Sequence, residues 1–331
     1  TAAPIIAPTI AGLMIDAFGW RSIFYLVLGI MAVSFVLSAV VFENVLELQE
    51  KHFDFPSFVG SVFAFGGITL GVGNLSAFGL ASWQAGGPLV VGVVACVLFL
   101  VRQCRLSTPF LDVKILRNRD YAVSVVASML LYLVMMGSSV MMPLYVQSVM
   151  GYSAVVSGLV TLPGSLATAL VSPLAGRLYD RVGIRSLFIP GALALLVSNL
   201  GMFFLTSHTP LWVAAVCNVV RNLAIGSLMM PLLTWGTSTV PAAKLADASS
   251  LLTSFRTIAG SIGSAVFVGI MTTVSAHAAA TYGDGALMHG MNLSFLGMAA
   301  GSLVLVGIAL AAGRPHRAPA PQTEEAPASS H

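Results

Sequence analysis

The 331 residues of this chain are 57% hydrophobic and only 8% charged, with a formal net charge of +3 and a mean hydropathy of +0.93. Soluble domains carry roughly 25% charged residues, so this composition excludes one large water-soluble globule, whose surface would lack polar groups. The basic balance does not indicate nucleic acid, because the basic residues collect between apolar runs on one predicted side of a membrane.

About ten apolar runs follow one another along the chain, and most reach the roughly 20 residues that a membrane-spanning helix needs. Backbone polar groups in lipid must bond internally, and the runs do not alternate with period two, so we expect helices rather than barrel strands. The first run is short and starts at the first residue, so we expect the chain to begin inside a helix, as a fragment of a longer protein. The expected runs cover 1–17, 20–42, 57–79, 86–101, 121–146, 154–175, 186–206, 211–234, 251–274 and 291–312.

The basic residues between these runs predict the orientation of the chain. If the first run leads outward, then Arg21 and Arg221 are the exceptions among the 15 Lys and Arg residues, and all the others fall on one side. This pattern obeys the positive-inside rule and predicts a multi-pass protein of the cell membrane with a cytoplasmic C-terminus. The last segment, 313–331, is rich in Pro, Ala and Ser, and we expect it to be a disordered cytoplasmic tail.

Arg221 is the clearest charged residue inside a predicted helix, with Asn218 and Asn222 on the same helical face. A charge within the membrane is costly, so one interpretation is that Arg221 faces a central cavity and contacts substrate or a charge partner that responds to protonation. The other interpretation is that Arg221 reaches toward a boundary or forms a structural pair. Tyr145 and Gln147 are further candidates for the cavity. No acid lies clearly within a run, so the sequence shows no proton-coupling carboxylate.

The segment AGRLYDRVGIRSL, at 175–187, joins two runs on the predicted cytoplasmic side. Its two glycines permit tight turning, and its aspartate can accept charge-assisted bonds from neighbouring arginines or from a helix N-terminus. Such a cluster can latch one conformation and release it in another; the alternative is a solvated basic turn that only fixes the topology. The residues of this predicted gate are Gly176, Arg177, Asp180, Arg181, Gly183 and Arg185.

At this segment the chain resembles the major facilitator superfamily. Residues 176–185 are similar to the cytoplasmic G-x-x-x-D-R-x-G-x-R signature in the C-terminal half of that superfamily. The stretch APTIAG at 7–12 is similar to the antiporter motif of the fifth helix, with alanine at two positions where the family usually has glycine. The stretches LPG at 162–164 and GSLMMP at 226–231 resemble the fourteen-helix drug:proton antiporter branch (EmrB/QacA type).

The resemblance implies an all-α integral membrane protein with a major-facilitator-type helical bundle, in which about ten of fourteen transmembrane helices are present. Residues 1–42 would then be the last two helices of the N-terminal bundle, and 43–120 would hold two extra linker helices and a cytoplasmic loop. Residues 121–312 would form the six-helix C-terminal bundle. Pro8 and Gly12 would shape the bend of the antiporter helix.

The resemblance also implies a function, namely secondary active transport and no enzymatic activity. The expected activity is proton-coupled export of small lipophilic or cationic compounds, of the multidrug type, by alternating access. The partners would be a small-molecule substrate, protons and the lipid bilayer, for a monomer without nucleic acid. No metal or other cofactor is expected, because the cysteines share no ligand spacing and no phosphate-cradling loop is present.

Three alternatives remain open at the level of the sequence. The first is export of one specific metabolite or of an antibiotic that the cell makes itself. The second is an integral-membrane enzyme, which would need paired acids or histidines at one membrane face, and these do not occur with motif spacing. The third is a passive pore, which would show conductance without coupling to a gradient.

Overall fold

The computed structural model describes residues 3–41, 54–78, 82–106, 113–241 and 244–312, and these are helical nearly throughout. The predicted tail at 313–331 lies outside the described residues. The elements in chain order are α1 (Ala3–Phe18), α2 (Arg21–Val41), α3 (Phe55–Phe78), α4 (Trp83–Arg105), η1 (Val113–Arg117), α5 (Arg119–Leu144), the π-helical turn η2 (Tyr145–Val149), α6 (Ala154–Phe203), α7 (Leu211–Ser238), α8 (Leu245–Tyr282), η4 (Gly283–Gly285) and α9 (Ala286–Ala311).

Each predicted apolar run corresponds to a helical segment, which confirms the all-α membrane fold. Within the described residues, 8 helices are long and apolar enough to cross a membrane. Helix α6, of 50 residues, contains two of the predicted runs. Its backbone leaves the helical region at Gly183 (φ 75°, ψ 174°), which lies between those two runs. Helix α1, of 16 residues, supplies the remaining run. A positive φ strains residues with a Cβ, so glycine is the residue that permits this break.

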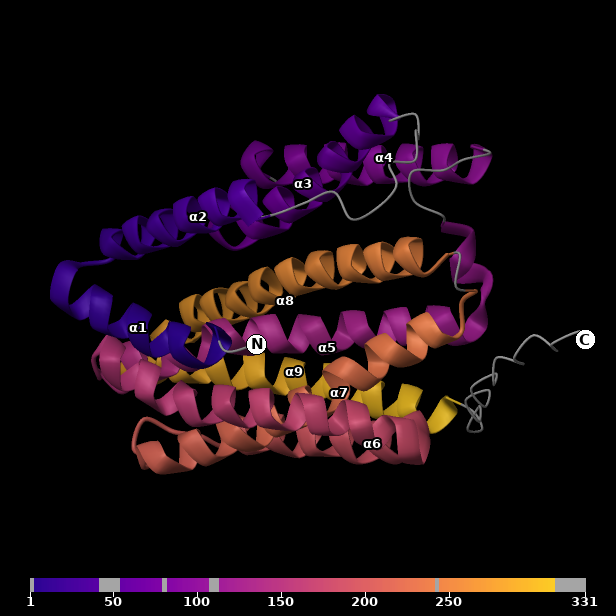
Figure 1. Cartoon of the computed structure of the whole chain (residues 1–331). Coiled ribbons are helices and arrows are strands. Elements are labelled where there is room, and N and C mark those ends of the chain that lie inside the picture. Colours follow the sequence, from indigo (N-terminus) through magenta and orange to yellow (C-terminus); the bar gives the residue numbers. More distant parts are fainter. Residues whose placement is uncertain (1–2, 42–53, 79–81, 107–112, 242–243, 313–331) are drawn as a thin grey trace, which may run out of the picture.

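Helices α5 to α9 pack side by side around one hydrophobic core (Figure 1). The core contains large side chains that are fully buried, among them Phe188 of α6, Leu228 of α7 and Phe295 of α9. Large apolar side chains on the outer faces of the same helices are exposed, as Val197 and Leu303 are. Lipid is as apolar as the protein interior, so such outward side chains have no tendency to turn inward.

Helices α3 and α4 form a hairpin that lies beside α8 (Figure 1). Small residues let their backbones approach closely: a Cβ on Gly67 would lie 2.6 Å from the Cα of Gly92, and one on Gly71 would lie 2.6 Å from the amide nitrogen of Leu89. The four-residue spacing of Gly67 and Gly71 places both on one face of α3, where small residues permit such contact. The two helix backbones of the hairpin are therefore in direct contact at these glycines.

A second, smaller core connects this hairpin to the bundle. Phe99 of α4, Val113 and Ile115 of η1, and Tyr121 of α5 are buried there together. The hydroxyl of Tyr121 donates a hydrogen bond of 2.7 Å to the carbonyl oxygen of Ala248 on α8. The apolar side of η1 thus faces protein.

Candidate functional site

Arg221 lies ten residues after the first residue of α7 (Leu211). At 1.5 Å per residue this is about 15 Å along the helix, near the middle of a hydrocarbon core of about 30 Å. The residue is only 2% exposed. Its guanidinium donates to Asn218 Oδ1 and, at 3.0 Å, to the sulfur of Met202, while its Nε has no hydrogen-bond partner. Arg221 lines a cavity between α5, α6 and α7, as the first interpretation expects, and its bond to Asn218 is a structural pairing of the kind that the second expects.

Asn222 continues this polar cluster toward α6. Its amide donates to the carbonyl oxygen of Asn218 at 2.8 Å, and Thr168 of α6 donates to Asn222 Oδ1 at 3.2 Å. The cavity has a volume of about 190 Å³. It is lined by hydroxyl, amide, guanidinium and apolar side chains, namely Met135, Ser138, Ser139, Met142, Pro143, Thr161, Ser165, Asn218, Arg221, Asn222 and Ile225.

Gly164 of α6 makes room for the two asparagines. A Cβ on this residue would lie 2.7 Å from the amide nitrogen of Asn222 and 2.9 Å from that of Asn218. Both atoms are the mobile ends of side chains, so Gly164→Ala should fold but displace the amides from Arg221. We expect the free energy of unfolding of this variant to fall by about 1.5–3 kcal/mol, since a hydrogen bond to a charged group is lost.

The measurement for Gly164→Ala is the thermal melting midpoint in detergent. Gly307→Ala is the matched control, because a Cβ on Gly307 meets nothing within 4 Å. Equal melting midpoints for the two variants would show that the position of the asparagines does not contribute to stability.

Arg256 is a second buried cation, which the sequence analysis assigned to the cytoplasmic side. Helix α8 begins at Leu245, so Arg256 lies three turns into the helix and is 7% exposed. Its guanidinium lies 3.9 Å from the ring centroid of Tyr132 on α5 and donates to the hydroxyl of that tyrosine. The signal was available, because Arg256 falls within the apolar run expected at 251–274.

The predicted gate lies on both sides of the break in α6. Arg177, Asp180, Arg181 and Arg185 are all exposed, and within the described residues no ion pair joins them. Gly183 adopts the positive φ that tight turning requires, whereas Gly176 lies within the regular helix. The expectation that Gly176 turns the chain is therefore corrected: helix α6 continues through it, and the loop shrinks to a single non-helical residue.

Tyr145 and Gln147 are not brought to the Arg221 cavity. Both lie in the π-helical turn η2 at the end of α5. Tyr145 is fully buried and its hydroxyl donates to the carbonyl oxygen of Thr206 at 2.9 Å, which gives it a structural role. Gln147 is exposed.

Helix α1 packs against the first turn of α6. A Cβ on Gly12 would lie 2.7 Å from the carbonyl oxygen of Ala154, so glycine permits this close approach. The carboxylate of Asp16 accepts a hydrogen bond of 3.3 Å from the backbone N–H of Val155, where the helix dipole favours negative charge. Pro8 lies within α1, which runs as one helix past both Pro8 and Gly12. Gly12 therefore permits a close helix contact, and the bend expected at Pro8 and Gly12 stays a prediction.

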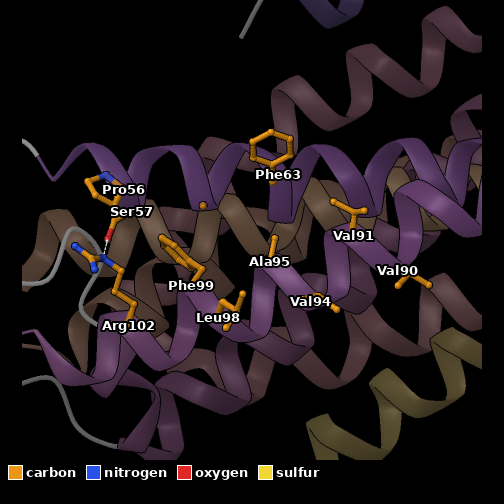
Figure 2. A pocket seen from close by; sticks show the side chains of 11 residues that line it. Pro56, Ser57, Phe63, Val90, Val91, Val94, Ala95, Leu98, Phe99 and Arg102 are labelled. Atoms are coloured by element: carbon orange, nitrogen blue, oxygen red, sulfur yellow. Dashed lines mark hydrogen bonds between the residues drawn. The ribbon is translucent and has the colours of Figure 1, made fainter.

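A separate groove of about 420 Å³ lies between α3 and α4 (Figure 2). Its wall consists mainly of apolar side chains, including Phe63, Val91 and Leu98, and these side chains are exposed on the membrane-facing surface. Arg102 lies at one end. Such an apolar groove suits contact with lipid chains, and its polar side chains, Ser57 and Arg102, lie at one end.

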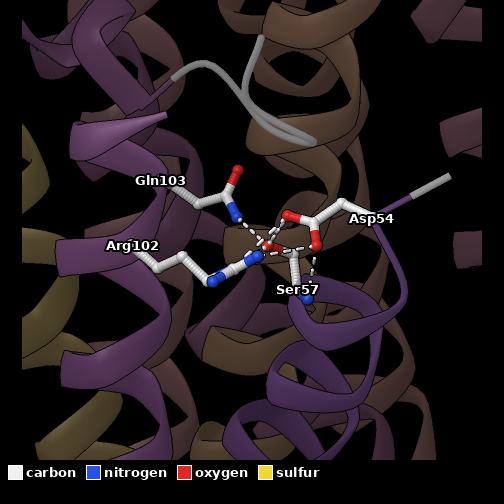
Figure 3. Close-up of polar contacts among 4 residues, drawn as sticks. All are labelled: Asp54, Ser57, Arg102 and Gln103. Carbon is white, nitrogen blue, oxygen red and sulfur yellow. Dashed lines mark hydrogen bonds and ion pairs between the residues drawn. The ribbon is translucent and has the colours of Figure 1, made fainter. Parts of the chain in front are cut away.

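Arg102 is held by a polar cluster where α3 begins (Figure 3). It donates to Asp54 Oδ1 at 2.9 Å and to the hydroxyl of Ser57 at 3.1 Å, and Gln103 donates to the same hydroxyl at 2.7 Å. Ser57 and Gln103 are fully buried. These bonds tie the two ends of the α3–α4 hairpin together.

The cluster predicts a pH dependence. Hydrogen bonds from Arg102 and Ser57 hold the pKa of the Asp54 carboxyl below its ordinary value of 3.8. A lowered folded-state pKa contributes stability that is present above the ordinary value and is lost as the pH falls through the lowered one. We expect the parent to melt at a higher temperature than Asp54→Asn from pH 5 to 7, and the difference to shrink below about pH 4. A difference that stays constant to pH 3 would contradict this assignment.

Comparisons with known proteins agree with this architecture. The family model described as Major Facilitator Superfamily matches residues 1–264. The uncharacterized MFS-type transporter YcnB of Bacillus subtilis (strain 168) is 34% identical over 308 residues, which cover 93% of this chain and 65% of YcnB. The lincomycin resistance protein LmrB of Listeria monocytogenes is 29% identical, over 82% of this chain and 57% of LmrB.

A solved structure supports the fold. The bacterial homolog of the human lysosomal transporter Spinster, in an inward-facing and occupied conformation, matches with a TM-score of 0.51 at 16% identity, over 76% of this chain and 66% of that one. The chain spans about two thirds or less of the length of these curated relatives. With the family model matching most of the sequence and the helical fold in agreement, the chain belongs to the Major Facilitator Superfamily.

Proposed function

We propose that this chain forms part of a proton-coupled exporter of small lipophilic or cationic compounds, of the multidrug type and of the fourteen-helix branch. The observation that carries the proposal is the cavity around Arg221, a half-polar, half-apolar chamber near the middle of the membrane-spanning helices. Transporters bind substrate near the midplane, between bundles that rock around the site. The similarity to LmrB, which is named as a lincomycin resistance protein, supports drug export.

In this proposal α5 to α9 are the C-terminal bundle, α3 and α4 are the extra linker pair, and α1 and α2 belong to the N-terminal bundle. The C-terminus lies in the cytoplasm, as the positive-inside pattern favours. The exposed gate residues Asp180, Arg181 and Arg185 would pair with the other bundle in one conformation and release it in the next. Proton entry would drive the cycle.

Everted membrane vesicles test the proposal. The vesicles are energised, the pH gradient is recorded with a fluorescent dye, and lipophilic drugs are added in turn. We expect drug addition to relax the gradient in the parent and to have a much smaller effect in Arg221→Ala. Arg105→Ala is the control, because Arg105 is an exposed arginine at the end of α4. If no compound relaxes the gradient, or if passive conductance appears instead, drug:proton antiport is rejected.

A further inference from the structure

The Arg221 guanidinium is a buried cation whose described partners are neutral. It donates to an amide oxygen of Asn218 and to the thioether sulfur of Met202, and neither carries a compensating charge. A guanidinium keeps its proton at physiological pH. A buried cation without a counter-charge is strongly disfavoured, so this arrangement indicates a missing anionic partner.

Two buried donors at the cavity have no acceptor. The Nε of Arg221 and the amide nitrogen of Asn218 lack any hydrogen-bond partner, and both residues are 2% exposed. An unsatisfied buried donor costs about 1–3 kcal/mol, more for a charged group, so this cluster is stabilised by any acceptor that reaches it. Both residues line the cavity, although these two nitrogen atoms are themselves buried and become accessible only when the side chains shift.

The rest of the lining supplies no negative charge. None of the residues that line the cavity is acidic. The hydroxyls of Ser138 and Ser139 donate to carbonyl oxygens of their own helix, and so does that of Thr161. The remaining wall is apolar, with Met142 and Ile225 among its members. The lining therefore combines a cation and polar groups with apolar side chains.

We propose that this cavity recognises the carboxylate of a small amphiphilic molecule, with the Arg221 guanidinium as its cationic partner and the apolar side chains of the lining against the hydrocarbon part. A planar guanidinium matches the geometry of a carboxylate better than that of a point anion. The inference rests on the proposed export function. It narrows the substrates to lipophilic acids and to zwitterions whose cationic group lies away from Arg221.

A matched pair of probes tests the charge requirement. Benzoate and benzamide share ring and shape, and differ in the negative charge. Their binding to the protein in lipid nanodiscs is measured by calorimetry at pH 7. We expect benzoate to bind at least about tenfold more tightly than benzamide, and Arg221→Gln to remove that preference. Arg256→Gln is the control, because that arginine is already engaged by Tyr132. Equal affinities for the two probes in the parent overturn the proposal.

A second variant separates loss of the site from loss of the fold. Asn218→Asp places a carboxylate at the position that already accepts from Arg221. This carboxylate should form an ion pair with the guanidinium and so compete with an anionic ligand. We expect this variant to melt at a higher temperature than the parent and yet to lose benzoate binding. A variant that binds benzoate as the parent does would overturn the assignment of Arg221 as the anion's partner.

The outcomes distinguish this inference from the function on which it rests. If lipophilic drugs relax the pH gradient but benzoate shows no preference over benzamide, export stands and the carboxylate site is rejected. If benzoate binds through Arg221 but no compound relaxes the gradient, the site stands and proton-coupled export is rejected.

Discussion

Gly263→Ala is expected to lower the free energy of unfolding by about 2–3 kcal/mol, because it forces two helix backbones apart. A Cβ on Gly263 of α8 would lie 2.1 Å from the carbonyl oxygen of Leu133 on α5 and 2.7 Å from its Cα. The obstructing atoms belong to the backbone and cannot rotate away as a side chain can. The measurement is the thermal melting midpoint in detergent together with the yield of monodisperse protein.

Gly307→Ala again supplies the comparison for this effect. Its Cβ would meet nothing within 4 Å, and alanine has the higher helix propensity, so this variant should match or slightly exceed the parent. If Gly263→Ala melts within a degree of Gly307→Ala, the close contact between α5 and α8 does not stabilise the bundle.

Tyr132→Leu is expected to destabilise the same helix pair by about 3 kcal/mol, for an electrostatic reason. The ring of Tyr132 lies under the guanidinium of Arg256, 3.9 Å from centroid to Cζ, and its hydroxyl accepts from the same group. A desolvated cation–π contact contributes about 2 kcal/mol and a hydrogen bond to a charged group about 1.5–3 kcal/mol, and the two do not add fully. Leucine removes both and leaves a buried cation alone.

A double-mutant cycle isolates this interaction. Tyr132→Phe keeps the ring and should lose only part of the stability, and Arg256→Met removes the cation that needs a partner. We expect Tyr132→Leu to cost much less in the Arg256→Met background than in the parent, because the two residues interact directly. Costs that simply add would show that the contact does not couple α5 to α8.

Hydropathy was enough to predict the helical membrane fold and the burial of Arg221, because both depend on local composition. A run of apolar residues of membrane length must be helical, whatever its neighbours are. The same reasoning counted Arg256 with the cytoplasmic loops, although the apolar run expected at 251–274 already contained it. Helix α8 in fact begins at Leu245, and Tyr132, from a helix distant in sequence, makes the position tolerable.

Contacts between residues that are distant in sequence could not be predicted from the sequence. Nothing local indicates that Gly164 makes space for the asparagines of α7, or that Arg102 pairs with Asp54 across the hairpin. Tyr145 shows the same limit: an aromatic residue with a hydroxyl near a helix end suits a cavity and a core equally well. Its bond to Thr206, in the segment that follows α6, decides for the core.

The glycine contact between α3 and α4 has a consequence for the order of assembly. These helices are neighbours in sequence, and backbones that touch directly need few side chains to be ordered first, so the hairpin can close as soon as both helices are inserted. Its docking partner α8 begins only at Leu245 and is therefore synthesised much later. During that interval the aromatic face of Phe65 and Phe99, which later meets α8, rests against lipid, a solvent that it tolerates. We therefore expect the α3–α4 hairpin to form first in the bilayer and to pack against α8 after that helix has been inserted.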